Sequence, residues 1–592
     1  MDLKVLQDET KNQIKRKDTF QITPILMDIL SSPQYSSDGM VVDVGGLFSL
    51  EIYSNNIDPS RKFFLLTPPK DNKEYEYKTM MDLASSVLGS KNSTERDQNR
   101  IKLMEEIGME TLSNPELYAM VDSTVSLQER LVELAGSISD YDRHTYTVDE
   151  AKDEFAFIDW TGILASSIPQ IIDTSNISIQ VYNIEYFKEL SYYANIDDPT
   201  RPIHKDAIAN HFMIYKIATE ASKLDSELRQ IIPDSTFQTR SSICIEKVLE
   251  RFGLAAGRFY SMITFGGESD KARLEAMATN IKRALIKRIQ NADWLDISTK
   301  NSATKKLRMM QASIGYSTFS PDERSPLDIR QFMHGLETDF DTFYETDRAA
   351  TRWRLQTYWD TLGERLNSTS WMGIITPQTV NAFNLLSKNS IFVSASFVQK
   401  PNYDRNYPDY FNYAGIGQSI GHEYSHGFDD LGSQYDEHGE KRDWWSIDTK
   451  AKYAKKTKCF VDEYSKASIT DKRGKSYFVD GKLTLGESIA DHEGLTAAYY
   501  AYLASKTKGK GYNPILPGLH NFSTESLFFI NAARSFCSKT TAEAETDSLY
   551  DEHAPDAIRV NVLFRNSIEF AKVFNCPIGS KMHPSEEKCQ IC

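Results

Sequence analysis

The sequence lacks both a long apolar run and an excess of basic charge. No stretch reaches the roughly 18 consecutive apolar residues of a spanning helix, so we expect no membrane segment in this chain. The opening segment, MDLKVLQDETKNQIKRKD, has no apolar core and therefore does not resemble a secretory signal. The formal net charge of −15 disfavours nucleic acid and anionic membranes as partners, because both reward clustered Lys and Arg.

Cysteine is unevenly placed. None of the six cysteines precedes Cys244, and the other five lie from Cys459 onward. Cys589 and Cys592 form a CxxC pair, but no second CxxC completes a zinc ribbon. Their even number and clustering fit disulfides in an oxidising compartment, and scattered cytosolic thiols are the alternative. Four sequons fit glycosylation of a secreted protein, at Asn92, Asn176, Asn367 and Asn521.

The remaining composition is that of an ordinary globular protein, with 40% hydrophobic and 26% charged residues. A length of 592 residues suggests more than one folding unit. Asp270–Gln290 spaces its apolar residues by threes and fours, which predicts an amphipathic helix. Ser390–Gln399 is rich in β-formers and of strand length. We therefore predict a mainly helical N-terminal lobe over 1–345 and a mixed α/β region over 346–592.

The segment IGHEYSHGFDD contains an HExxH motif. His422 and His426 are four residues apart, so on a helix their side chains are neighbours that can reach one zinc. Glu423 can then reach the water at the metal as a general base. Composition gives about 0.03 chance matches to this motif in the chain, so an exposed polar helix face is a poor explanation. Gly417 and Gly421 weaken the helix, which close approach of another element would explain.

The third metal ligand is not local. Asp429 and Gly432 stand where a metzincin needs Gly and His, so that pattern fails. A second predicted helix begins near Thr484 and carries Glu487 and Asp491 on one face. Glu487 is the candidate third ligand, and Asp491 would orient a ligand histidine through its other ring nitrogen. Thr484-x-x-Glu487 also fits a capping box, so cap and ligand are equally compatible with the residues alone.

Several stretches in order resemble the neprilysin family of zinc endopeptidases. They are NYAGIGQSIGHEYSHGFDDLGSQYDEHGEKRDWW, GESIADHEGL, LPGL, LFFINAARSFC, HAPDAIRV and FNCPIGSKMHPSEEKC, and ADWLDISTKNSATKKLRMMQASIGYS extends the likeness upstream. The resemblance implies an α+β, mostly α fold, with a two-lobed neprilysin-like ectodomain and a thermolysin-like zinc catalytic domain. It also implies one Zn²⁺ per chain, peptide substrates and an extracellular or cell-surface location, with a type II membrane anchor in a full-length form.

The resemblance also assigns roles to single residues. It makes His422, His426 and Glu487 the zinc ligands and Glu423 the general base. Asp429 and Asp491 would be the carboxylates that orient the ligand histidines.

Four further roles follow from the same resemblance. His553 would stabilise the transition state, and Arg559 would grip the substrate backbone. Asn381 and Ala382 would belong to the strand that pairs with substrate. Cys459 and Cys589 resemble a disulfide pair of the family.

These observations together predict a zinc-dependent endopeptidase that hydrolyses oligopeptides with a metal-activated water. The alternative is a catalytically silent, peptide-binding relative. A peptidase whose third ligand lies closer is a further rival, but Trp445 and Ser446 stand where its glutamate would be. A structural zinc site fits least, because such sites usually have four protein ligands.

Overall fold

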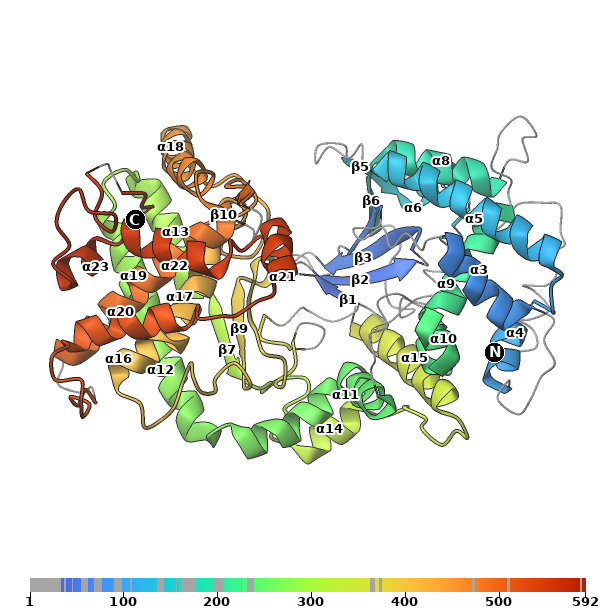
Figure 1. Cartoon of the computed structure of the whole chain (residues 1–592), viewed down its shortest axis with the longest axis horizontal. Coiled ribbons are helices and arrows are strands. Elements are labelled where there is room, and N and C mark those ends of the chain that lie inside the picture. Colours follow the sequence, from blue (N-terminus) through green and yellow to red (C-terminus); the bar gives the residue numbers. More distant parts are fainter. Residues whose placement is uncertain are drawn as a thin grey trace. The chain divides into compact units, whose positions relative to one another are not determined.

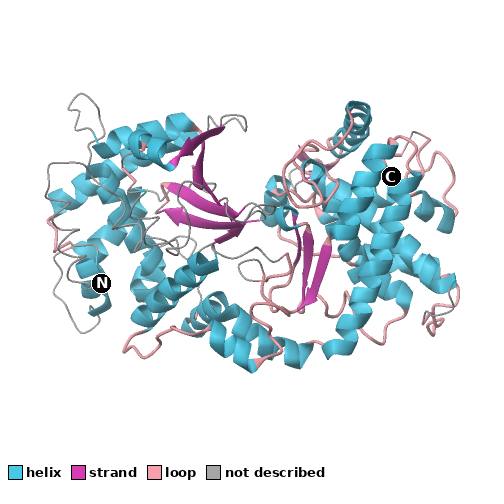
Figure 2. Cartoon of the chain, turned by 180° about the vertical axis from the view of Figure 1, so that it is seen from behind, coloured by secondary structure: helices cyan, strands magenta, loops and turns pink. Residues whose placement is uncertain are grey.

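The three-dimensional structure is a computed structural model of the chain. It describes residues 34–591 apart from these gaps: 37–38, 45, 55–61, 69–76, 90–97, 107–108, 136–142, 156, 159, 161–176, 196–205, 225, 232–238, 362–367, 372–374, 471–473, 508–511 and 586–587. These residues form two compact units, the first within Met1–Phe252 and Met333–Leu366 and the second within Gly253–Phe332 and Asn367–Cys592. Both are mostly helical, and each contains a sheet (Figures 1 and 2).

The first unit contains a six-stranded sheet in the order β1-β2-β3-β4-β6-β5. Neighbouring strands are antiparallel except β4 and β6, which are parallel. The strands are β1 (Gln34–Ser36), β2 (Gly39–Val44), β3 (Phe48–Ser54), β4 (Lys62–Thr67), β5 (Arg143–Thr147) and β6 (Ile177–Tyr182). The described helices are α3 (Tyr77–Leu88), α4 (Gln98–Glu106), α5 (Asn114–Ala135), α6 (Val148–Glu154), α8 (Ile184–Asn195), α9 (Asp206–Leu224), α10 (Ser226–Ile231) and α15 (Phe343–Thr361). Along β6 every second residue is buried, so one face of the sheet contributes to the core.

The centre of the second unit consists of three helices that pack together, α12 (Gly267–Asn291), α17 (Ile416–His426) and α19 (Leu485–Thr507). Around them lie α13 (Ile297–Met309), α14 (Pro326–Phe332), α16 (Asp409–Ala414), α18 (Ile447–Tyr464), α20 (Thr524–Arg534), α21 (Ala542–Asp547), α22 (Asp556–Asn566) and α23 (Ile568–Val573). The strands β7 (Gln311–Gly315), β8 (Ala382–Leu385) and β9 (Ser390–Ser394) form a sheet in the order β7-β9-β8. A hairpin consists of β10 (Ser468–Thr470) and β11 (Ser476–Phe478), and α11 (Arg240–Thr264) precedes α12.

The predicted helix over Asp270–Gln290 is confirmed as α12. Its buried apolar residues recur every three or four positions, from Leu274 to Ile289. The predicted strand over Ser390–Gln399 is shorter, because β9 ends at Ser394. There the Ser394 hydroxyl accepts a hydrogen bond from the Phe397 N–H, which turns the chain out of the sheet.

The boundary between the units differs from the one expected at residue 345. Residues 253–332 belong to the second unit. In that segment α12 packs on α13, α17 and α19, and β7 pairs with β9. Residues 333–366 instead belong to the first unit, where α15 packs on α9. The chain therefore enters the second unit before it completes the first.

The disulfide implied by the family resemblance is present between Cys459 and Cys589. Cys244, Cys537 and Cys576 are free thiols. Of the four sequons, Asn521 is exposed and the other three lie outside the described residues. No described helix is both long and apolar enough to cross a membrane.

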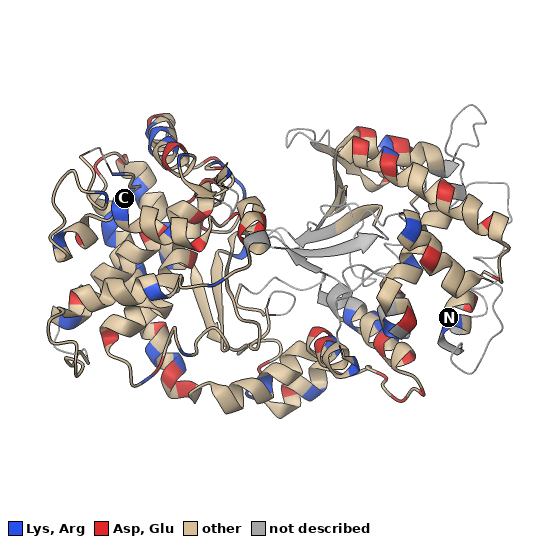
Figure 3. Cartoon of the chain, in the orientation of Figure 1, with Lys and Arg blue, Asp and Glu red and all other residues tan. Residues whose placement is uncertain are grey.

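Residues of both charge signs lie along α18, where lysines fill the middle of the helix and acidic residues lie near its two ends (Figure 3). On that helix Lys452 pairs with Asp448 and Lys458 with Asp462, each four residues apart. Such exposed pairs support a helix by about 0.3–0.5 kcal/mol each.

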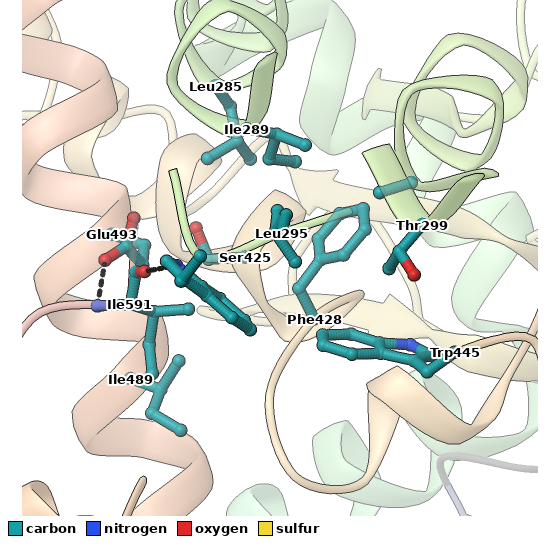
Figure 4. Close-up of a pocket in the computed structure, with 12 residues that line it drawn as sticks. Leu285, Ile289, Leu295, Thr299, Ser425, Phe428, Trp445, Ile489, Glu493 and Ile591 are labelled. Carbon is teal, nitrogen blue, oxygen red and sulfur yellow. Dashed lines mark hydrogen bonds between the residues drawn. The ribbon is translucent and has the colours of Figure 1, made fainter. Parts of the chain in front are cut away.

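A small apolar cavity adjoins the C-terminal part of α17. It is lined by residues of α12, α13, α17, α19 and the C-terminal segment, including Leu285, Ile289, Leu295, Ser425, Phe428, Ile489 and Ile591 (Figure 4). On its border the Glu493 carboxylate accepts hydrogen bonds from Arg288 and from the backbone N–H of Ile591. The C-terminal segment is thereby fixed against α19.

Candidate metal centre

The candidate metal centre lies where α17 crosses α19, and two glycines allow the crossing. A Cβ atom at Gly421 would stand 2.5 Å from the carbonyl oxygen of Gly494, and one at Gly494 would stand 2.4 Å from the backbone nitrogen of His422. The backbones therefore touch, which confirms the close approach expected at Gly421. Gly417 differs, because a Cβ there would meet its neighbours at ordinary distances of 3.4 Å or more.

This crossing brings together the three predicted ligands. The Nε2 atoms of His422 and His426 are 2.9 Å apart, and Glu487 oxygens lie 3.1 Å from the first and 3.4 Å from the second. Donors bound to one tetrahedral zinc at about 2.0–2.1 Å would lie roughly 3.3 Å apart. Two imidazole nitrogens and one carboxylate oxygen with a fourth position left over form the donor set of a catalytic zinc site. The residues present thus fit the metal.

Two carboxylates contact the candidate ligand histidines. Asp491 lies 2.9 Å from Nδ1 of His422, and Asp429 lies 2.7 Å from Nδ1 of His426. An Nδ1–H that donates to a carboxylate leaves the Nε2 lone pair free for a metal. Both carboxylates are buried, so water does not compete for these bonds.

The carboxylate of Glu487 faces the histidines and does not cap its helix. The Thr484 N–H donates to the Asp480 carbonyl, so the reciprocal bond of a capping box is not made. Burial alone would raise the pKa of Glu487, but contacts with His422 and His553 outweigh burial and hold it far below its usual range. Glu487 is therefore anionic, as a zinc ligand must be.

Glu423 is buried and lies on α17 between the two candidate ligand histidines, His422 and His426. Burial raises the pKa of Glu423, and the charges of His422 and His426 oppose that shift. Its backbone carbonyl accepts a hydrogen bond of 2.6 Å from the Asn384 side chain, which ties β8 to α17. A carboxylate with a raised pKa close to the donor set is suited to accept a proton near neutral pH.

His553 comes from the loop before α22 and reaches the same centre. Its Nε2 lies 2.9 Å from a Glu487 oxygen, and its Nδ1 lies 2.8 Å from Asp551. Burial alone would lower the pKa of His553, but the bond to Glu487 and its charge raise it. The His553 side chain is also half exposed.

Arg559 lies on α22 and grips Asp491. Its Nε and one terminal nitrogen donate to the two Asp491 oxygens at 2.8 and 2.7 Å. Burial alone would raise the pKa of Asp491, but the Arg559 charge and the bond from His422 hold it below its usual range. Arg559 therefore orients Asp491, in addition to the substrate contact predicted for it.

Asn381 and Ala382 lie at the start of β8, on the edge of the three-stranded sheet. β8 pairs with β9 on one side, and no described strand pairs with its other side. The Asn381 side chain accepts a hydrogen bond from the Ala382 N–H. The predicted substrate-pairing strand is thus an edge strand attached to α17 through Asn384.

Two segments, residues 12–317 and 381–591, match peptidase family M13. The chain belongs to peptidase family M13. Neprilysin-1 of Caenorhabditis elegans is 27% identical over 609 residues, which cover 98% of this chain and 76% of that protein. An endothelin-converting enzyme homolog of Locusta migratoria is 32% identical over 461 residues, 75% of this chain and 60% of that protein. This M13 chain thus spans about three fifths to three quarters of these relatives.

Solved structures share the fold of this M13 chain. The Mycobacterium tuberculosis zinc metalloprotease ZMP1 in complex with an inhibitor superposes with a TM-score of 0.71 at 20% identity, over 100% of this chain and 84% of that one. PepO from Lactobacillus rhamnosis HN001 gives 0.72 at 20% identity, over 100% and 87%. These likenesses confirm the predicted α+β, mostly α, two-lobed fold. Members of M13 are in general zinc-dependent metallopeptidases.

Three residues at the M13 site were not found from the sequence. Asn384 and Asp551 contact Glu423 and His553, and Lys306 holds the segment after His426. Asp551 and His553 are two residues apart, so a local Asp-x-His bond was a usable signal. For Asn384 and Lys306 the partners are far away in the chain, and only the fold brings them together.

Proposed function

We propose that this chain is a zinc-dependent endopeptidase that hydrolyses peptide bonds in oligopeptides. The observation that carries the proposal is the convergence of two imidazole nitrogens and one carboxylate beside the buried Glu423. His422, His426 and Glu487 would hold one zinc ion per chain. When bound there, zinc would lower the pKa of water and polarise a carbonyl group.

Glu423 would act as the general base. It would take a proton from the attacking water and pass it to the leaving amine. Its raised pKa lies closer to neutral pH than that of an exposed glutamate, which favours both uptake and release of the proton. Such a group typically contributes 10²–10⁴-fold to the rate.

His553 would stabilise the charge that develops on the scissile carbonyl oxygen. Its raised pKa favours the protonated ring, which can donate a hydrogen bond from Nε2. A donor of this kind is worth about 3 kcal/mol of transition-state stabilisation. Asp551 supports this role, because its carboxylate holds Nδ1 and leaves Nε2 directed at the centre.

The substrate would bind as an extended peptide along the free edge of β8. Asn381 would contact the peptide through its side-chain amide, because its backbone N–H donates to Thr379 and its carbonyl accepts from Ser394. Ala382 would pair with the peptide main chain through its backbone once the Asn381 side chain releases its N–H, as in other proteins that add a strand to a sheet. Arg559 would contact the peptide backbone through its remaining terminal guanidinium nitrogen, the one that does not donate to Asp491. The disulfide between Cys459 and Cys589 supports an extracellular or cell-surface location.

Metal analysis and turnover of a quenched peptide test the proposal together. We expect about one zinc per chain and hydrolysis that a chelator abolishes and zinc restores. A chain that binds zinc and peptide but does not cleave would instead be the catalytically silent, peptide-binding relative. A chain that binds no zinc would contradict the site itself.

A further inference from the structure

Lys306 is a buried lysine in α13 whose ammonium group has no role in the chemistry described above. Its residue is 2% exposed. Nζ donates to three backbone carbonyls, those of Gly427 and Gly432 at 2.8 Å and of Tyr435 at 2.7 Å. All three acceptors belong to residues 427–435, which directly follow the ligand His426.

The same segment contains the carboxylate that orients His426. One Asp429 oxygen faces Nδ1 of His426, and the other accepts the backbone N–H groups of Leu431 and Gly432. Gly432 thus donates to Asp429 through its N–H and accepts from Lys306 through its carbonyl. The segment folds back tightly, since a Cβ at Gly432 would stand 1.7 Å from the His426 carbonyl oxygen.

The chemistry of the site suits an ammonium group. Three carbonyls satisfy its three N–H bonds, and the rings of Phe428 and Trp444 lie 5.5 and 6.0 Å from Nζ. Burial lowers the pKa of Lys306 to about 7, with Asp429 and other nearby carboxylates opposing that shift. The three acceptors favour the protonated form, because a neutral amine would turn its lone pair toward one of the carbonyl oxygens.

The helix that carries Lys306 is itself fixed at both ends. At its start the Asp296 carboxylate accepts hydrogen bonds from Thr299, Ser446 and Thr449. Near its end the Lys306 carbonyl accepts a hydrogen bond from the Asn389 side chain. The ammonium group therefore extends from a rigid support onto the segment after α17.

We propose that Lys306 is a positioning residue that holds residues 427–435 so that Asp429 orients His426 toward the metal. This inference rests on the proposed zinc site. Loss of Lys306 would loosen the segment, let the Asp429 carboxylate move, and free the His426 ring to turn away. The expected signature is faster release of zinc from a folded protein.

The test measures the rate of zinc release into excess chelator for the wild type and for Lys306→Met. Methionine keeps the apolar stem and removes the donors. We expect about a tenfold faster release, the lower end of the 10–100-fold range for residues that support metal ligands. Lys306→Gln, whose shorter side chain cannot reach all three carbonyls, has the same expected direction and serves if the first variant does not fold.

Lys271→Met is the matched control. Lys271 is also buried and also donates to backbone carbonyls, those of Ile314 and Tyr316, which lie outside residues 427–435. It should lower the melting temperature and leave the rate of zinc release within about twofold. Equal acceleration in both variants would show a general loss of stability and overturn the proposal.

A double-mutant cycle with Asp429→Asn tests the route of action. If Lys306 acts through Asp429, adding Lys306→Met to Asp429→Asn should change zinc release little further. Multiplying effects would overturn this route, as would a wild-type rate in folded Lys306→Met. A wild type without bound zinc would instead contradict the proposed function, so the two failures are distinguishable.

Discussion

Gly421 and Gly494 lie in direct backbone contact where α17 crosses α19, with 2.5 Å between a Cβ placed on Gly421 and the Gly494 carbonyl oxygen. This contact sets the distance between the two histidines on one helix and Glu487 on the other. Neither helix alone holds three ligands. The crossing is therefore as necessary to the metal centre as the ligands themselves.

Gly494→Ala should separate the helices and weaken zinc binding. The added Cβ would stand 2.4 Å from the His422 backbone nitrogen, and backbone cannot move aside cheaply. We expect a loss of about 1–3 kcal/mol of stability from overpacking and a clear loss of bound zinc. Thermal unfolding and metal analysis measure the two effects. Gly417→Ala is the control for loss of a helical glycine, because Gly417 lies on α17 and a Cβ there would meet its neighbours at 3.4 Å or more.

Arg559→Met should raise KM for peptide hydrolysis by about 10- to 100-fold, the cost of roughly one charge-assisted hydrogen bond. Zinc content should remain near one per chain at neutral pH, since Asp491 keeps its contact with His422, but zinc release should be faster because Asp491 loses the two hydrogen bonds that orient it. Arg565→Met is the control, because Arg565 also lies on α22 but pairs with Glu463. Unchanged kinetics would show that Arg559 acts on Asp491 alone.

Zinc affinity should rise with pH through the neutral range. Burial alone would lower the pKa of His422, but its contacts with Asp491 and Glu487 raise it well above its ordinary value in the metal-free protein. Below that raised pKa the ring holds a proton that zinc must displace, and above it the ring is free to bind. Affinity should therefore increase about tenfold per pH unit for each proton displaced.

Chelator competition at several pH values, combined with proton release measured on binding, checks this dependence. An affinity that levels off above about pH 6.5, the ordinary histidine value, would contradict the raised pKa.

Helix α17 could be predicted from the sequence because the HExxH motif that marks it is local. His422, Glu423 and His426 lie within one and a half turns, and helix geometry alone places them together. Glu487 could not be decided in this way, since Thr484-x-x-Glu487 satisfies both a cap and a ligand. The choice depends on a crossing between helices that are some sixty residues apart in the chain. It is decided by the Glu487 carboxylate, which faces His422 and His426 while the Thr484 N–H donates to Asp480.

Other features that the sequence did not predict also depend on contacts between residues that are far apart in the chain. The parallel pairing of β4 with β6 joins residues more than a hundred positions apart, so local patterns did not indicate the six-stranded sheet. The unit boundary was missed because α12 is an ordinary amphipathic helix, and periodicity does not say which unit its apolar face contacts. The burial of Lys306 was not predicted, because a lysine on a helix is usually exposed and its three carbonyl partners lie more than a hundred residues away in the chain.

Glu423→Gln and Glu487→Gln, assayed side by side for bound zinc and for turnover of a quenched peptide, test the central claim most directly. In Glu423→Gln the new side chain is nearly isosteric with the native one but cannot accept the proton, so zinc should stay near one per chain while turnover falls by at least about 10²–10⁴-fold. Replacement of Glu487 removes a ligand charge, so that variant should lose both zinc and turnover. Full turnover by Glu423→Gln, or full zinc content with full turnover in Glu487→Gln, would contradict the account.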